Sequence, residues 1–169
     1  MRIFCLLAGL LVVSSPALSQ GMPGSPLINY DGYSEMVKEV APIRRDRLIP
    51  LAEFQHKATL PGTLVLDARS AEAFAEGHIM GAVNLPLPDF TAQALARLIG
   101  ANQDRAILIY CNNNFINNVR PVATKRIELA LNIQTFINLH GYGYRNIFEL
   151  GEAVDMNAPE VGWIRGTSG

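Results

Sequence analysis

Two short apolar runs constrain the fold of this chain more than any other feature of its sequence. In residues 63–67 (TLVLD) and 106–110 (AILIY), apolar side chains follow one another over the length of a strand without alternating with polar ones. Such a strand is buried on both faces, as happens in a parallel sheet that helices cover on both sides. The two runs therefore predict a central parallel sheet.

The residues around these runs predict alternating strands and helices. Further short strands are expected at residues 48–49, 82–85 and 146–150. Helices are expected at 51–58, 71–76 and 92–99, with a last one that carries Ile133, Phe136 and Ile137 and closes at Gly141 and Gly143. Gly77 and Gly100 end two of the helices, and Asp89 is the expected N-cap of the third. Strands that alternate with helices give an α/β domain with helices on both faces of the sheet.

The N-terminus has the features of a secretory signal peptide. Met1-Arg2 is a positive start, and residues 3–13 are uncharged but too short for a bilayer span, which needs about 20 apolar residues. Ala17-Leu18-Ser19 has the small-x-small pattern of a cleavage site. We therefore expect residues 1–19 to be removed and the mature protein to be exported, to a periplasm or to the extracellular space.

The mature chain is expected to contain one domain with two extensions. Residues 20–46 are predicted to form an N-terminal arm, with a short helix over 29–40 that Pro42 stops. The domain itself is placed at residues 47–155. Residues 156–169 are expected to be a C-terminal tail in which Trp163 acts as a surface clamp.

Composition and spacing exclude several classes of ligand. The chain has 14 Lys+Arg against 15 Asp+Glu, a formal net charge of −1, and its cations form no basic stripe, so nucleic acid is not an expected partner. No other apolar run of the sequence is long enough to span a membrane either. His56 and His140 share no metal-ligand spacing with each other or with Cys111, so no metal site is expected.

Cys111 is the group best placed for chemistry. Cys5 belongs to the predicted signal peptide, so the mature chain keeps one thiol and has no internal disulfide. Cys111 directly follows the most apolar strand, at the edge of a parallel sheet where ligands bind. Loop N–H groups and the N-terminus of the next helix would favour its thiolate. The alternative is that Cys111 is a small buried hydrophobic residue without reactivity.

Three asparagines follow Cys111 and are expected to shape its loop. Asn112, Asn113 and Asn114 tolerate left-handed backbone conformations almost as well as glycine does. Successive N–H groups could then turn inward and form a nest that holds an anion. The sequence therefore predicts that these three residues contribute to substrate binding.

The motifs on either side of Cys111 resemble those of the rhodanese family. Asp67 and Arg69, with residues 77–86 (GHIMGAVNLP), are similar to the family's first signature, which ends in G-H-I-x-G-A-x-N-x-P. Residues 143–151 (GYRNIFELG) are similar to its closing G-Y-x-N-V-x-x-L-x-G. Cys111 lies where the family has its catalytic cysteine. The resemblance covers about residues 48–151 and implies a rhodanese-like three-layer α/β domain.

This resemblance implies a sulfurtransferase. Cys111 would accept a sulfane sulfur from a small sulfur-containing donor as a persulfide and pass it to a thiol or another nucleophile. Loop N–H dipoles would stabilise the anionic persulfide, without a metal or cofactor. His78 is expected to turn the chain and bond to backbone. Asp67 and Arg69 are expected to support the site as a structural ion pair, with substrate contact as the alternative.

The loop after Cys111 departs from the family pattern. The family's C-x-x-x-x-R motif has its arginine at the position that Ile116 occupies here, and the first cation is Arg120. Counted back from Gly143 by the family's usual helix length, the next helix would begin near Asn132, its expected N-cap. Residues 112–131 are therefore interpreted as a long insertion, and Arg120, Lys125 or Arg126 could supply the anion-binding charge. Arg120 is favoured, because the following proline restricts its backbone and because a guanidinium binds an oxyanion with two hydrogen bonds.

This loop leaves three functions open. The first is a sulfurtransferase that carries a persulfide on Cys111. The second is a cysteine-dependent phosphatase or arsenate-reductase-like enzyme on the same fold, and the third is a non-catalytic rhodanese-like module that binds a partner or senses a thiol ligand. N–H groups aimed at the sulfur favour an enzyme, whereas a sulfur covered by Phe115 or Ile116 favours a binding module.

Overall fold

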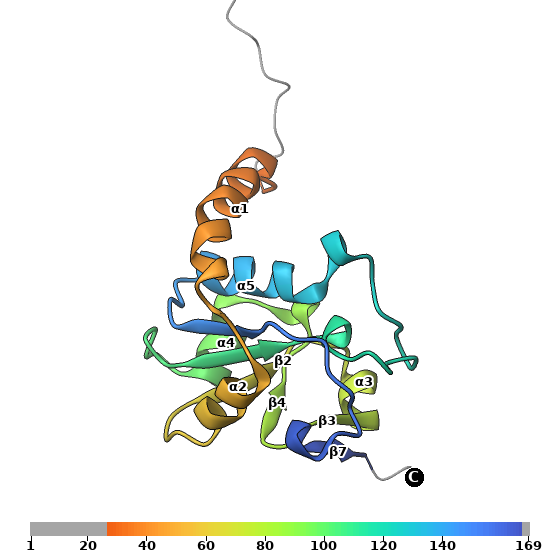
Figure 1. Cartoon of the computed structure of the whole chain (residues 1–169). Helices are drawn as coiled ribbons and strands as arrows, with labels where there is room; N and C mark the ends of the chain where they lie inside the picture. Colours follow the sequence, from red (N-terminus) through yellow and green to blue (C-terminus); the bar gives the residue numbers. More distant parts are fainter. Residues whose placement is uncertain (1–26, 167–169) are drawn as a thin grey trace, which may run out of the picture. The chain divides into compact units, whose positions relative to one another are not determined.

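A five-stranded parallel sheet organises the unit Asp31–Gly169 in the computed structural model, which describes residues 27–166 (Figure 1). Its strand order is β1-β6-β5-β2-β4. The strands are β1 (Leu48–Ile49), β2 (Leu64–Asp67), β4 (Ala82–Asn84), β5 (Ile107–Tyr110) and β6 (Ile147–Leu150). All neighbouring pairs are parallel, and every residue of β2 and β5 is buried, as the two apolar runs predict. The predicted signal peptide lies outside the described residues.

Helices cover both faces of this sheet, which confirms the predicted α/β class. One apolar cluster joins the sheet to the helices α1 (Tyr30–Arg45), α4 (Ala92–Ile99) and α5 (Leu131–Gly141). A second cluster joins the opposite face to α2 (Leu51–Ala58) and α3 (Ala71–Glu76). Figure 1 shows α5 and α2 on opposite sides of the strands. Within residues 27–166, no helix is both long and apolar enough to cross a bilayer.

Two helix ends differ from their sequence predictions. Helix α1 continues through Pro42 to Arg45, because the burial of Val40 and the ion pair of Arg44 with Glu149 hold its last turn on the domain. Helix α5 begins at Leu131, so Asn132 lies in its first turn and is not its N-cap. In both cases tertiary contacts outweigh a local signal.

The N-cap of α4 is also different from the predicted one. Thr91 caps this helix, and its hydroxyl accepts a hydrogen bond from the Ala94 N–H at 3.1 Å. Asp89 lies just before it, in a short 3-10 turn at Leu87–Asp89. The turn places the threonine, not the aspartate, at the first free N–H groups of the helix.

The C-terminal segment is part of the packed structure. Strand β7 (Trp163–Arg165) pairs antiparallel with β3 (Gly77–Ile79) and forms a second, two-stranded sheet. Trp163, predicted to be a surface clamp, is half-buried against the second apolar cluster. Gly77 ends α3 as predicted, but its φ of 167° is extended, so it has no need of left-handed freedom. What Gly77 does provide is space, because a Cβ there would lie 2.4 Å from Nε1 of Trp163.

We expect Gly77→Ala to destabilise the domain by about 1–3 kcal/mol, the usual cost of overpacking a tight contact. Urea denaturation of the wild type, both single variants and the Gly77→Ala/Trp163→Leu double variant measures the coupling between the two positions. The alanine should cost much less when the indole is absent. An equal cost in both backgrounds would show that the indole is not the obstacle.

Candidate active site

Cys111 lies directly after the buried strand β5, where the chain enters the short 3-10 helix η2 (Asn112–Asn114). Its thiol is the free cysteine of the described residues, and the residue is 1% exposed. Its sulfur accepts a hydrogen bond from the Asn114 N–H, while the Cys111 N–H donates to Oδ1 of Asn114 at 2.9 Å. Cys111 and Asn114 therefore form a capping box at the start of η2, in which each side chain accepts a hydrogen bond from the other residue's N–H.

Backbone N–H groups from two chain segments surround the Cys111 sulfur. Asn113 contributes one from the loop, and Leu131 and Asn132 contribute two from the first turn of α5, and all three act to lower the pKa of the thiol. The sequence predicted both sources, the loop and the end of the next helix. Their convergence forms a cradle suited to a negatively charged sulfur.

Burial nevertheless raises the pKa of Cys111 above its ordinary value. Desolvation is the largest influence, and the negative charge of Glu149 acts in the same direction. The expectation that the site favours the thiolate therefore does not hold in this structure, because the energy of burying a charge exceeds what the N–H groups return. At neutral pH the Cys111 side chain is a protonated thiol.

The three asparagines act differently from the prediction. Among residues 27–166, no residue other than glycine has a positive φ, so Asn112, Asn113 and Asn114 do not adopt left-handed conformations. They form a 3-10 turn, and it is their side chains, not unusual backbone angles, that hold the loop in place. Oδ1 of Asn114 accepts from Cys111 and from Nδ2 of Asn132, and its Nδ2 donates to the Leu150 carbonyl at 2.7 Å. Asn114 thus ties the loop to α5 and to the end of β6.

An ion pair between a half-buried arginine and a buried glutamate supports this cradle from the side of α1. Arg44 binds Glu149 through two N–H groups, at 2.6 and 2.5 Å. Glu149 is 4% exposed, and its Oε1 also accepts a hydrogen bond from Nδ2 of Asn132. Sequence analysis missed Arg44, Glu149 and Asn132 as site residues. The one local signal is a carboxylate inside the otherwise apolar run of β6 (IFEL).

Two buried oxygen atoms near Cys111 lack a hydrogen-bond donor among the described residues. They are Oδ1 of Asn112 and Oδ1 of Asn132, in residues that are 6% and 3% exposed. Leaving a buried acceptor unpaired costs about 1–3 kcal/mol.

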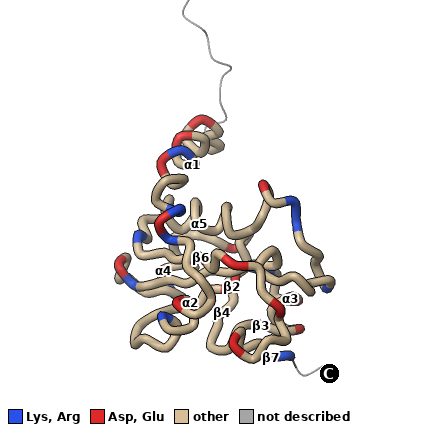
Figure 2. Tube along the Cα trace, viewed as in Figure 1, with Lys and Arg blue, Asp and Glu red and all other residues tan. Residues whose placement is uncertain are grey.

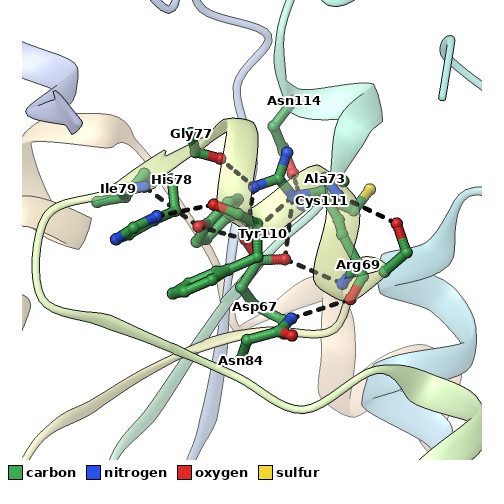
Figure 3. A network of polar contacts seen from close by, with 12 residues as sticks. Asp67, Arg69, Ala73, Gly77, His78, Ile79, Asn84, Tyr110, Cys111 and Asn114 are labelled. Carbon is green, nitrogen blue, oxygen red and sulfur yellow. Dashed lines mark hydrogen bonds and ion pairs between the residues drawn. The ribbon is translucent and has the colours of Figure 1, made fainter. Parts of the chain in front are cut away.

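A second buried network holds the ends of β2 and β5 together (Figure 3). Arg69 and Asp67 form an ion pair at 2.6 Å, and both are almost fully buried. The Tyr110 hydroxyl donates to the same carboxylate at 2.6 Å and accepts from the Ile79 N–H. Burial and the charge of Asp67 raise the pKa of Tyr110 well above its ordinary value. The arrangement is the structural ion pair that the sequence suggested.

His78 also has the contacts of a structural residue. Its Nδ1 lies 2.9 Å from the Phe74 carbonyl oxygen, and the two rings stack with centroids 3.8 Å apart. This bond to backbone agrees with the predicted role. No cluster of three His, Cys, Asp or Glu side chains able to hold a metal occurs among the residues that the structure describes.

The cations of the long loop lie on its outer part (Figure 2). Arg120 is exposed and lines a cavity of about 480 Å³, whose lining does not include Cys111. Lys125 reaches the cysteine loop through its backbone, because its N–H donates to Oδ1 of Asn113 at 3.0 Å, while its side chain is exposed. Arg126 is exposed and 3.6 Å from Glu128. None of the three cations has a side-chain contact with the cradle that holds the sulfur.

The two apolar residues that could cover the sulfur behave in opposite ways. Ile116 is 71% exposed and points away from the core. Phe115 is fully buried in the second apolar cluster, with its ring edge-on to Tyr110 and Trp163. Neither residue has a described contact with the sulfur, so the feature expected of a binding module is not found among residues 27–166.

Comparisons with known proteins agree with this architecture. A sequence profile described as a rhodanese-like domain matches residues 51–150. Thiosulfate sulfurtransferase from Pseudomonas aeruginosa has a similar solved structure, with 21% identity and a TM-score of 0.50 over 70% of this chain and 20% of that one. A rhodanese-like domain from Anabaena sp. is 20% identical, with a TM-score of 0.46 over 62% of this chain and 67% of its own. No curated protein matches the chain significantly.

The raised pKa gives a testable pH dependence for Cys111. Because only the thiolate reacts, alkylation of the folded protein by iodoacetamide should be slow at neutral pH and should increase with a midpoint above the ordinary value of 9.0. Glu149→Gln removes a negative charge beside the sulfur, so its midpoint should fall. A midpoint that falls by about one pH unit corresponds to an approximately tenfold larger thiolate population at neutral pH.

Glu128→Gln is the matched control, because Glu128 is exposed and belongs to the outer loop. Its alkylation profile should match that of the wild type. If Glu149→Gln and Glu128→Gln have the same midpoint, the charge of Glu149 does not control the thiol.

Proposed function

The chain belongs to the rhodanese-like domain family, and on that basis we propose that it is a sulfurtransferase that carries sulfane sulfur as a persulfide on Cys111. One observation carries the proposal: N–H groups from the loop and from α5 converge on a single thiol at the carboxyl end of a central strand. A core cysteine that serves only packing needs no such cradle. The proposed substrates are a small sulfur-containing donor and a thiol or other nucleophilic acceptor.

The proposed reaction has two displacement steps. In the first, the Cys111 thiolate attacks the outer sulfur of the donor, a new S–S bond forms at Sγ, and the donor's own bond to that sulfur breaks. Its electron pair leaves with the remainder of the donor, which is sulfite when the donor is thiosulfate. In the second, the acceptor attacks the outer sulfur of the persulfide, and Sγ leaves as a thiolate. Neither step needs an external oxidant or reductant.

The N–H cradle would act at the point where charge accumulates. The persulfide is anionic, and N–H dipoles that are already oriented stabilise such a charge without reorganising. Asn114 is a positioning residue in this scheme, because it fixes the cysteine loop to α5 through its hydrogen bond with Asn132. Arg44 and Glu149 would hold the same helix end from the other side.

The burial of Cys111 predicts a slow enzyme for small donors such as thiosulfate. At 1% exposure, the thiol can meet a donor only after the loop around Asn112–Asn114 moves. The same observation favours a second candidate, a non-catalytic module that binds a partner or senses a thiol ligand. The phosphatase alternative needs the same cysteine and can be tested with the same variant.

Cys111→Ser should abolish sulfur transfer while leaving the fold intact. Serine is nearly isosteric, so stability should change by about 1 kcal/mol, but its hydroxyl cannot hold a persulfide. The measurement is mass spectrometry of the purified mature protein after incubation with thiosulfate or an organic persulfide. We expect one added sulfur on the wild type and none on the variant.

Further assays separate the candidate functions. Added sulfur on Cys111→Ser would place the chemistry elsewhere, and no added sulfur on either protein would favour the binding module. Release of phosphate from an aryl phosphate by the wild type but not by the variant would support the phosphatase. Unfolding of Cys111→Ser would instead indicate that the residue serves the core.

We further propose that the protein is exported after cleavage near Ser19. The support is the sequence pattern of residues 1–19, which lie outside the described part of the chain. N-terminal sequencing of exported protein should find a start at or near Gln20. Recovery of exported protein with an intact Met1 would contradict this expectation.

A further inference from the structure

The long loop forms one wall of a cavity that the cysteine does not line. The cavity has a volume of about 480 Å³, within the range of small-molecule sites. Its walls come from three parts of the chain: α3 and the start of β3, the loop at residues 117–120, and the C-terminal segment with β7. The insertion after Cys111 thus contributes to a cavity that is separate from the cysteine.

Hydrogen bonds hold two of these walls in place. Nδ2 of Asn117 donates to Asp155 at 2.6 Å, and Oδ1 of Asn117 accepts from the Met156 N–H at 3.0 Å, so the loop is attached to the C-terminal segment. Asn118 is 6% exposed, and its Nδ2 donates to the Val122 carbonyl at 2.7 Å. These bonds fix the backbone on both sides of Arg120 and give the cavity a defined wall.

The cavity carries positive charge that the described residues do not neutralise. The Arg69 side chain is neutralised by Asp67, but the Arg120 side chain has no hydrogen bond or ion pair within residues 27–166, and the Arg165 side chain donates only to Oδ1 of Asn157. Glu76 is the one acidic residue of the lining in this part of the chain. The described lining therefore contains two arginines with unused donors and a single carboxylate, that of Glu76. Their planar N–H pairs match the oxygens of a carboxylate, sulfonate or phosphate.

Apolar side chains complete the same cavity. Trp163 and Met156 are half-buried in its wall, and Val119 is exposed at the loop. The guanidinium of Arg69 lies 5.2 Å from the centre of the Trp163 ring and helps to hold the indole in the wall. A ligand that satisfies both parts has an apolar body and one acidic group.

We propose that this cavity is a binding site for a small organic anion, which Arg120 and Arg165 hold by its acidic group while Trp163 and Met156 contact its apolar body. The site is separate from the Cys111 thiol. The long loop then has a role in ligand binding. Arg120 binds an anion, as its sequence position suggested, but in this cavity and not beside Cys111.

Trp163 makes the proposal directly measurable, because it is the single tryptophan of the chain. Its fluorescence can be titrated with cyclohexanecarboxylate, which has an apolar ring and a carboxylate and does not absorb at the wavelengths used. Acetate lacks the apolar body, and cyclohexylamine carries the opposite charge. The titrations use the mature Cys111→Ser protein, so the result does not depend on whether the proposed sulfur transfer is correct.

We expect a saturable fluorescence change with cyclohexanecarboxylate that is weaker at high salt, and a much weaker response to acetate and to cyclohexylamine. Arg120→Ala and Arg165→Ala should each weaken binding at least about tenfold, the loss of charge-assisted hydrogen bonds to the anion. Arg97→Ala is the matched control, because Arg97 is exposed on α4 and lies outside the cavity lining. It should bind like the parent protein.

Several results would overturn the proposal. They are the absence of a saturable change with cyclohexanecarboxylate up to millimolar concentration, equal binding of cyclohexylamine, and unchanged binding by the Arg120→Ala/Arg165→Ala double variant. Both arginines are exposed, so the double variant should keep its thermal midpoint, and loss of binding by a protein with that midpoint intact counts in favour of the site.

Discussion

The buried ion pair between Asp67 and Arg69 is the interaction on which the rest of the structure depends. The pair lies at the end of β2. Its carboxylate accepts a hydrogen bond from the Tyr110 hydroxyl at the end of β5, and its guanidinium donates one to the Gly77 carbonyl at the start of β3. Removing one partner of such a pair typically costs about 3–5 kcal/mol, because the other charge stays buried and unpaired. The strand ends that it fixes carry Cys111 on one side and part of the lining of the 480 Å³ cavity on the other.

The environment of Cys111 combines two opposing influences on one thiol. The N–H groups of Asn113, Leu131 and Asn132 favour negative charge on the sulfur, while burial and the nearby Glu149 disfavour it. Burial has the larger effect in this structure, so the pKa of the thiol lies above its ordinary value although three N–H groups are directed at the sulfur.

Local sequence signals predicted most helix and strand positions correctly, but they failed at helix ends that contacts with distant residues determine. The bounds of α2, α3 and α4 agree with their predictions, because apolar spacing and end signals act within each helix. Pro42 did not end α1, and Asn132 did not cap α5, because each lies beside a buried contact made by a residue far away in the chain. The fold itself was predictable from the motifs around β3, β4 and β6, which set turns and close packing.

The sequence by itself determined the parallel sheet and the place of Cys111 at the end of its central strand, since both follow from short apolar runs and their neighbours in the chain. Only the tertiary structure decided the state of that thiol. Glu149 meets Arg44 across 105 residues of sequence, and Arg120 joins Arg165 at one cavity although its loop follows the cysteine in sequence. A pKa and a binding site depend on which groups share a small, poorly solvated volume, and that volume exists only after distant segments have packed together.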